Sequence, residues 1–353
     1  MRTFVPDGAA HAASTADGPS PAWGIRRAVR LSFPDPAALA GDLVHTERLR
    51  RYLTDLLRPY GRAPDPDALG PGAPRRGGQS YGEMAEALIR ATVPPGEAVD
   101  LLVLAYSLPD ITPGRATTTY LSHVCPGTPM AFAVSDQGAA GAFTALRLVD
   151  AYARSGGLRR ALLLVVEQDW LPYDPGIPVA TPAGSHGVAL LFGEPQPGER
   201  VARVSRVATR TLPTDSPGAA LAAELGVLGH PEGPVPVTAI LGGTPEAAIL
   251  GGTPEAGAGP PAGAAHPLPE GLRFADAGQP GTGVWWELAG ELVGGPVGGP
   301  VDVTADSTAD PTAPVTARPT AAPRRLLLAD HDAGSRHLSL ATIDLDGDGG
   351  VPG

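Results

Sequence analysis

Two short segments hold the residues best suited to chemistry. Ser135, Asp136 and Gln137 follow one apolar stretch, and His331 lies between two aspartates after another. A carboxylate such as Asp136 serves as a general base when burial raises its pKa toward neutrality, and the charge of flanking acids raises the pKa of a histidine that carries protons. The alternatives are structural. Ser135 or Asp136 caps the helix that follows, and residues 330–335 form an ordinary hairpin turn.

Other reactive side chains have weaker claims. Cys125 is the single cysteine, which excludes an internal disulfide and a cysteine-cluster metal site, and a lone cysteine is usually a small buried apolar residue. The aspartates at 344–348 imitate the start of a calcium loop but lack a flanking pair of helices, so a solvated acidic tail is favoured. For Glu167, at a strand end, we expect a structural hydrogen bond near a dimer interface. The sequence predicts no metal site and no tightly bound cofactor.

Composition narrows the class of protein. The chain has 353 residues, of which 42% are hydrophobic and 18% charged, as in soluble globular proteins. It contains no lysine, which excludes Schiff-base chemistry, and its net charge of −11 argues against nucleic-acid binding. Neither an apolar run long enough to span a membrane nor a secretory signal is present, so the expected compartment is the cytoplasm. Arginines cluster at 26–30 and 48–62, either as solvated helix faces or as docking sites for an anionic carrier protein or nucleotide-bearing thioester.

The pattern of residues 22–195 predicts strands that alternate with helices. The strands are apolar along their whole length, which is typical of a mostly parallel sheet covered on both faces. Ser80 with Glu83 fits a capping box, and Gly156-Gly157 ends the last helix. We expect strands at 23–33, 98–105, 130–134, 161–167 and 187–192, and helices at 36–60, 80–91, 120–124 and 140–154.

Residues 199–345 repeat this theme with long interruptions. The nonapeptide AILGGTPEA occurs twice, at 239–247 and 248–256, and a period of nine without a third copy builds no solenoid. We interpret it as replication slippage into a surface loop. The expected organisation is a disordered leader at 1–21, one half at 22–195 and a second at 199–345, with low-complexity insertions at about 242–265 and 293–323. The second half is expected to form strands at 201–209, 235–241, 325–329 and 338–343, and helices at 221–228 and 283–292.

The order and spacing of Val99 to Glu167 resemble the type III ketoacyl-acyl carrier protein synthases of the thiolase superfamily. A strand, a sharp turn, a small-residue helix start and the pair Ala145-Leu146 follow one another as in that family. Ser185 to Ala189 is similar to its Asp-Gly-Ala-Ala strand entry, Gly278 to Thr282 to its Gly-Asn-Thr turn, and Leu326 to Ala341 to its closing hairpin. The resemblance implies a five-layered αβαβα thiolase-like fold of two pseudo-repeated halves, dimeric through the strand edge at 130–134.

The chain departs from the family at every catalytic position. The resemblance places the nucleophilic cysteine at Ala139, whose methyl group cannot attack a thioester. The family's histidine would fall in the strand that begins at Thr238, which has none, and Gln279 stands in place of its asparagine. Loss of all three argues against ordinary condensation chemistry.

Three functions fit the resemblance. The first is a cytoplasmic acyltransferase of bacterial secondary metabolism, in polyketide or fatty acid biosynthesis, which takes acyl groups from coenzyme A or an acyl carrier protein without a cysteine acyl-enzyme. The second is a catalytically inactive partner of an active ketosynthase, like a chain-length factor. A simple acyl-binding pseudoenzyme is a third. The chain would be a homodimer, or a heterodimer with a ketosynthase. The candidate catalytic residues are Asp136 and His331; the candidate substrate-binding residues are Ser135, Gln137, Gly138, Ala139, Gln279 and Gly334.

Overall fold

The computed structural model of the protein describes ten segments of the chain. The expected leader, the helix at 221–228 and nearly all of both low-complexity insertions lie outside them. No helix among the described residues is long and apolar enough to cross a bilayer. The described residues are 23–69, 79–112, 116–155, 157–177, 179–196, 199, 201–212, 236–243, 271–293 and 323–345.

Ten strands of the described chain form one continuous sheet. Its order is β3-β2-β4-β5-β1-β6-β10-β9-β7-β8, and a single residue pair, Ile25 with Ala202, joins β1 to β6. The strands before this joint are β1 (Gly24–Ser32), β2 (Leu101–Ala105), β3 (Met130–Val134), β4 (Arg160–Glu167) and β5 (His186–Gly193). Those after it are β6 (Ala202–Thr211), β7 (Val237–Gly242), β8 (Gly271–Phe274), β9 (Arg324–Asp332) and β10 (His337–Leu345).

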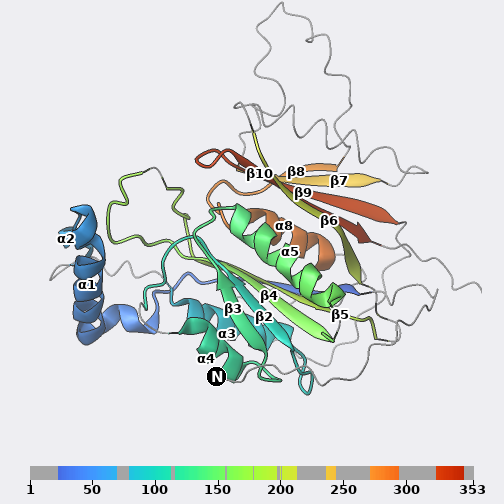
Figure 1. The fold of residues 1–353 in the computed structure, drawn as a ribbon, viewed down its shortest axis with the longest axis horizontal. Coiled ribbons are helices and arrows are strands. Elements are labelled where there is room, and N and C mark those ends of the chain that lie inside the picture. Colours follow the sequence, from blue (N-terminus) through green and yellow to red (C-terminus); the bar gives the residue numbers. More distant parts are fainter. Residues whose placement is uncertain are drawn as a thin grey trace, which may run out of the picture.

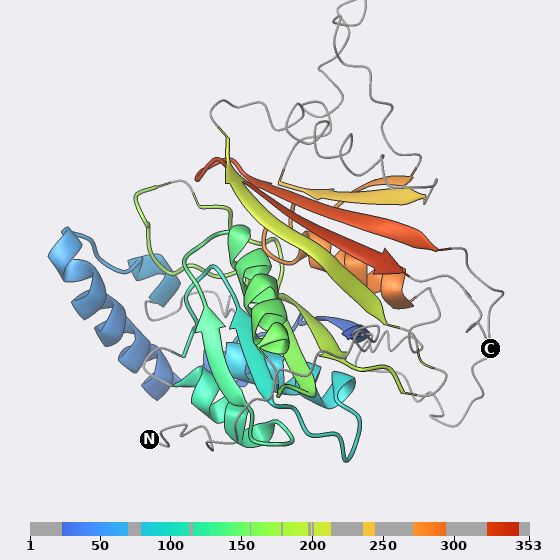
Figure 2. The ribbon, with the colours of Figure 1, turned by 45° about the vertical axis from the view of Figure 1, so that its right-hand side comes forward.

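Helices cover the first half of the sheet on both faces. Helices α3 (Tyr81–Thr92) and α4 (Thr117–Val124) lie on one face, and α5 (Ala140–Arg154) lies on the other. Helix α8 (Gly283–Val293) lies beside α5, between the two halves (Figure 1). The remaining helices are η1 (Ala38–Gly41), α1 (Leu43–Leu57), η2 (Arg58–Tyr60) and α2 (Pro66–Leu69). Of these, α1 lies at the periphery of the molecule (Figure 2).

The buried apolar residues follow this layering. One cluster joins α5 and α8 to inward-facing residues of both halves, with Phe143 of α5 against Trp285 of α8 at a ring distance of 4.9 Å. A second joins α3 and α4 to the opposite face of the first half. A third, including Leu327 and Leu340, lies on the outer face of the second half. The described residues thus show four alternating layers of the α/β fold, with α5 and α8 at the centre.

The expectation of a mostly parallel sheet is wrong. Among the described strands, four pairs are parallel and five are antiparallel, including β4 with β5 and β1 with β5. The inference failed because an unbroken apolar run reports burial of both faces, which the helical layers impose on parallel and antiparallel strands alike.

The capping box expected at α3 is also absent. Ser80 precedes the helix, but its side chain caps no backbone N–H; instead the N–H of Tyr81 donates to Asp110 Oδ1 at 3.3 Å. Helix α1 has the cap that α3 lacks, since Asp42 Oδ1 accepts from Val44 and His45.

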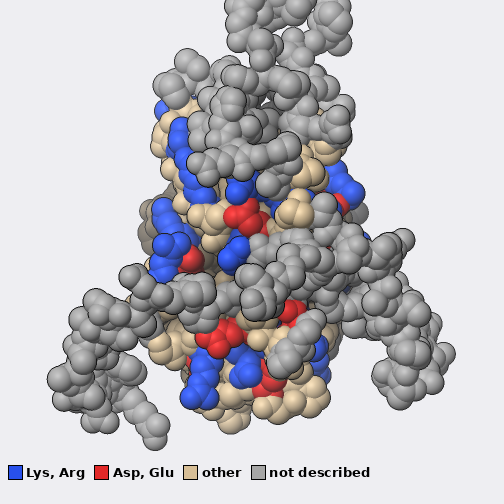
Figure 3. Space-filling view, turned by 90° about the vertical axis from the view of Figure 1, so that its right-hand side faces the viewer, with Lys and Arg blue, Asp and Glu red and all other residues tan. Residues whose placement is uncertain are grey.

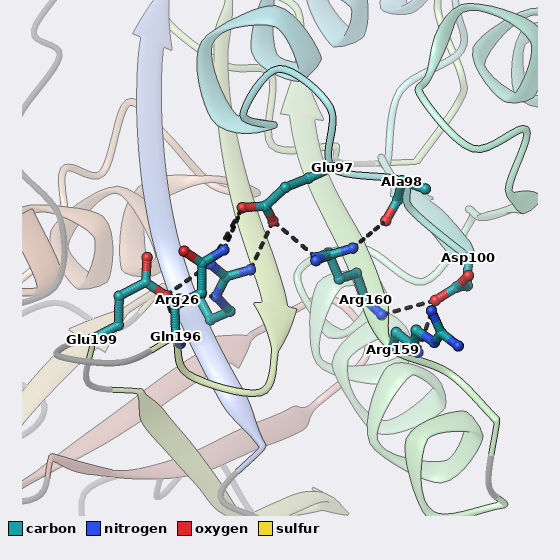
Figure 4. A network of polar contacts seen from close by, with 8 residues as sticks. All are labelled: Arg26, Glu97, Ala98, Asp100, Arg159, Arg160, Gln196 and Glu199. Carbon is teal, nitrogen blue, oxygen red and sulfur yellow. Dashed lines mark hydrogen bonds and ion pairs between the residues drawn. The ribbon is translucent and has the colours of Figure 1, made fainter.

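A buried ion network ties the strand ends far from the start of α5. Arg26 of β1 donates to Glu97 Oε2 at 2.8 Å and to Glu199 Oε2 at 2.8 Å, and Arg160 of β4 lies 2.9 Å from Glu97 (Figure 4). Gln196 donates to the second oxygen of Glu97 at 3.0 Å. The network therefore links β1 and the central strand β4 to the segment that leads to the second half. On the part of the surface visible in Figure 3, basic and acidic side chains are interspersed rather than gathered by sign.

Candidate functional site

The turn between β3 and α5 carries the first group of predicted site residues. Ala139 immediately precedes the helix, and Asp136 and Gly138 adopt left-handed backbone conformations with φ of +60° and +52°. No side chain caps α5, so the capping alternative for Ser135 and Asp136 is wrong. Ser135 Oγ instead donates to Asp136 Oδ2 at 3.3 Å.

This turn is open to solvent on one side. Asp136 and Gln137 are exposed, while Ser135, Gly138 and Ala139 are half-buried. The amide oxygen of Gln137 accepts from Thr144 Oγ1, one turn into α5, at 2.7 Å. Asp136 is therefore not the buried carboxylate that the sequence hypothesis required. The methyl group of Ala139 stands where the helix N-terminus would stabilise a nucleophilic anion.

The β9–β10 hairpin meets this turn through Asp332. A side chain at position 138 would collide with Asp332 Oδ2, so the carboxylate lies directly against Gly138. The other oxygen, Oδ1, accepts from the N–H groups of Gly334 at 2.9 Å and Ser335 at 3.1 Å. Gly334, a predicted binding residue, therefore gives its N–H to the chain's own carboxylate.

His331 lies on the other face of the sheet. Strand β9 extends through Asp332, so residues 330–332 are strand residues and not the turn that the sequence suggested. Side chains alternate along a strand, and Leu328 faces the central layer while Leu327 faces outward. This alternation turns Asp332 toward α5 and His331 outward, where its register partner is the outward-facing Leu338. The structure thus does not bring His331 together with Asp136.

A second carboxylate, Glu167, holds the start of α8. The Glu167 side chain at the end of β4 accepts from the N–H of Gly281 at 2.8 Å, from the N–H of Thr282 at 3.3 Å and from the Thr282 hydroxyl. The residue is only 3% exposed. Burial raises its pKa to about 7, and the hydrogen bonds from Thr282 and Gly281 oppose that rise. Sequence reasoning predicted a structural hydrogen bond for Glu167, and the structure gives that bond its partners.

Asp330 lies nearby and was not among the predicted site residues. It is 4% exposed, and its Oδ1 has no hydrogen-bond partner within the described chain. Burial raises the pKa of Asp330 to about 8, with further contributions from the charges of Asp332 and Glu167. Side chains alternate along a strand, so extending β9 by two residues from inward-facing Leu328 would have predicted that Asp330 also faces inward.

Gln279 belongs to the α8 end of the region. Its N–H donates to the carbonyl of Asp276 at 3.0 Å, and its own carbonyl accepts from the N–H of Gly283 at 2.9 Å. The two residues between Gln279 and Gly283 that follow Pro280 are the ones whose N–H groups Glu167 accepts.

His186 Nδ1 lies 4.0 Å from Glu167 Oε1, but burial lowers the His186 pKa, and its Nδ1 also lies 3.1 Å from the Gly184 carbonyl. A neutral imidazole gives Glu167 no charged partner.

Cys125 lies outside this region. It ends α4 and is buried in the cluster of α3, α4 and the opposite face of the sheet. Burial raises the pKa of the Cys125 thiol to about 12, so it is protonated at neutral pH and is not a nucleophile that replaces Ala139. Within the described residues, no group of three His, Cys, Asp or Glu side chains could hold a metal ion.

Comparisons with known proteins identify the fold. No family model matches the chain, and no curated protein matches its sequence. Solved structures do match. AbyA1, a tetronic acid condensing enzyme, has 16% identity and a TM-score of 0.52 over 91% of this chain and 99% of that one. ChlB3, described as an acyltransferase, has 17% identity and a TM-score of 0.51 over 92% and 98%.

OleA of Xanthomonas campestris is similar to the same degree. A cysteine-to-serine variant of OleA, solved with lauric acid and lauroyl-CoA, has 14% identity and a TM-score of 0.51 over 91% of this chain and 98% of that one. The chain therefore has the mixed α/β fold of the thiolase-like condensing enzymes, as the sequence predicted. At these identities the likeness establishes the fold alone.

Proposed function

We propose that the chain binds acyl thioesters of coenzyme A or of a carrier protein at the β3–α5 turn and acts on them without forming an acyl-enzyme. The observation that carries the proposal is Ala139 at the start of α5, in a fold whose solved examples include condensing enzymes and an acyltransferase. The cysteine-to-serine OleA variant with bound lauroyl-CoA supports the idea that this fold binds an acyl thioester in a chain from which a cysteine has been removed.

The side chains at the turn suit a direct transfer. The hydroxyl or amine of an acceptor attacks the thioester carbon, and its proton passes to a carboxylate, for which exposed Asp136 is the candidate. The carbon–sulfur bond then breaks, and the departing thiolate takes the proton back. Asp332, against Gly138, is a second carboxylate in the same place. General-base assistance of this kind contributes about a hundredfold or more to a rate.

The test measures thiol release from lauroyl-CoA with a panel of amines and alcohols, together with the intact mass of the protein. We expect release that depends on an acceptor, no acyl adduct on the protein, and loss of release in Asp136→Asn. Asp150→Asn is the matched control, because Asp150 lies further along α5, where it pairs with Arg154 at 2.9 Å. An acyl adduct on the wild-type chain, or full activity in Asp136→Asn, would refute the mechanism.

A second candidate function is that of a catalytically inactive partner of a cysteine-bearing ketosynthase. Two observations favour it. The N–H groups of Gly334 and Ser335 are bound to Asp332 and are not free to stabilise an oxyanion. Strand β3 lies at the sheet edge with Met130 and Ala133 exposed, so a second sheet could add there.

Coexpression with a cysteine-bearing homologue encoded nearby tests this candidate. A stable complex that dissociates in Phe132→Glu, on the same edge strand, would support it. The candidate function is ruled out if the purified chain forms a stable homodimer and does not bind the homologue.

A further inference from the structure

The ends of β2 and β3 lie side by side at the candidate site. The two strands are parallel and in register, with Ala105 beside Val134 (Figure 1). One position further, the N–H of Tyr106 donates to the carbonyl of Val134 at 3.2 Å, so Tyr106 lies beside Ser135. Residues paired across two strands direct their side chains to the same face of the sheet. Burial raises the pKa of Tyr106, and a hydrogen bond with the Ser135 side chain opposes that rise. The two hydroxyls are therefore bonded to each other across the strand ends.

Asp136 reaches the same hydroxyl through its backbone conformation. In an extended strand its side chain would point to the face opposite Ser135. The backbone of Asp136 is instead left-handed, with φ of +60°, and Ser135 Oγ donates to Asp136 Oδ2 at 3.3 Å. Such a conformation is costly outside glycine and persists where the surrounding structure holds it, often at functional sites. The strain at Asp136 thus indicates that its carboxylate is held in a defined position.

The hydrogen bonds of this chain of side chains run in one direction. A serine hydroxyl has a single proton and two lone pairs. Since Ser135 gives its proton to Asp136, its oxygen must accept from the hydroxyl of Tyr106. Hydrogen bonds linked in this way polarise one another, so the Tyr106 hydroxyl strengthens the bond to the carboxylate. The chain binds Oδ2 of Asp136 and leaves Oδ1 to receive a proton.

The core of the first half anchors these side chains. The Tyr106 ring packs against the ring of Tyr81 in α3 at a distance of 4.8 Å. Tyr81 is fully buried, and its hydroxyl donates to the carbonyl of Leu108 at 2.9 Å. Ser107, next to Tyr106, donates from its hydroxyl to the carbonyl of Gly138 at 3.0 Å. The residues that follow β2 therefore brace the β3–α5 turn at two points.

We propose that Tyr106 is a positioning residue for acyl transfer, which acts through Ser135 to direct Oδ1 of Asp136 at the acceptor. This inference rests on the proposed function and adds to it the residue that orients its base. The acceptor's oxygen or nitrogen bonds to the thioester carbon as its proton passes to Oδ1, and that proton then goes to the departing thiolate. Tyr106 and Ser135 keep their own protons throughout. Orientation matters because a displacement of about 1 Å can slow a reaction about a hundredfold.

The kinetics of thiol release from lauroyl-CoA, with the most active acceptor of the panel at saturation, measure this effect. Tyr106→Phe removes one oxygen and should lower kcat about tenfold without changing KM for lauroyl-CoA, because only the transition state uses the oriented base. Ser135→Ala should lower kcat similarly, and Ser135→Thr, which keeps a hydroxyl, should restore most of that loss. Tyr120→Phe is the matched control, since it removes a hydroxyl of α4 that donates to Glu86 of α3. Circular dichroism checks that each variant is folded.

A double-mutant cycle separates positioning from a merely structural effect. In an Asp136→Asn background, Tyr106→Phe should have no further effect on the residual rate, because the carboxylate through which it acts is gone. The inference is overturned if Tyr106→Phe keeps the kcat of the wild type, if Ser135→Thr recovers nothing of what Ser135→Ala loses, or if Tyr106→Phe costs the same in both backgrounds. Thiol release that is absent in the wild type, or complete in Asp136→Asn, would instead refute the proposed function itself.

Discussion

Replacing Glu167 with glutamine is predicted to change how the stability of the protein depends on pH. Glu167 is buried, and its pKa in the folded chain is about 7 against an ordinary value of 4.5. The folded state therefore holds this proton more tightly than the unfolded state does. The free energy of unfolding must fall as pH rises from about 4.5 to 7 and then level off. The interval between the two pKa values corresponds to about 3 kcal/mol.

Glutamine carries no titrating group, and its one oxygen still accepts from the N–H groups of Gly281 and Thr282, while its amide nitrogen takes the place of the oxygen that accepts from the Thr282 hydroxyl. Urea unfolding of the wild type and Glu167→Gln, at several pH values between about 4.5 and 8.5, measures the difference. The stability of the variant relative to the wild type should rise by about 3 kcal/mol across that range. The companion variant Thr282→Val removes a hydroxyl that lowers the Glu167 pKa. The free energy of unfolding of Thr282→Val should therefore continue to fall to a higher pH than that of the wild type. Parallel curves for the wild type and Glu167→Gln would refute the account of this carboxyl.

Two further variants test contacts that hold the site and the sheet. Gly138→Ala should lower the free energy of unfolding by about 2–3 kcal/mol, because it adds a collision with Asp332 to a left-handed backbone. In an Asp332→Gly background the same substitution should cost only about 1 kcal/mol. An unchanged cost would contradict the contact between Asp332 of the hairpin and Gly138 of the turn. Arg26→Ala should cost about 3 kcal/mol, because the side chain is 1% exposed and removing it leaves Glu97 and Glu199 without their shared partner. Arg50→Ala, in an exposed pair with Glu47, should leave the urea midpoint unchanged, and equal effects of the two arginines would contradict the burial argument.

Local pattern was sufficient to predict the elements around the site. The apolar run at 130–134 and the amphipathic run at 140–154 coincide with β3 and α5. Small residues at 139–142 and an apolar stripe along the helix are signals contained in a few consecutive residues. A helix with this pattern is stable only where its apolar stripe is buried, as it is in the central layer.

Signals that depend on distant residues were not visible in the same way. β8, at 271–274, was missed because it is short and half-buried. β9 was ended too early, since aspartate and histidine disfavour strands in isolation. Burial against α8 and the outer apolar cluster overrides that preference in the folded chain.

The candidate site shows the same division. The spacing from Ala145-Leu146 placed Ala139 before α5 without any structure. The contact between Asp332 and Gly138, and the shared location of Asp330 and Glu167, join residues more than a hundred positions apart. Such pairings need the register of two strand layers, which a single sequence does not contain.

The central claim is that an acyl thioester occupies the turn at Ala139, and the most direct measurement places a reporter there. Ala139→Cys introduces a half-buried thiol into a chain whose own Cys125 is buried and has a pKa of about 12, so iodoacetamide should modify the new position alone. Labelling is followed by intact mass with and without saturating lauroyl-CoA. We predict that lauroyl-CoA slows modification of the Ala139→Cys thiol about tenfold or more. Modification at the same rate in the presence of bound lauroyl-CoA would show that the thioester binds elsewhere and would contradict the proposed function.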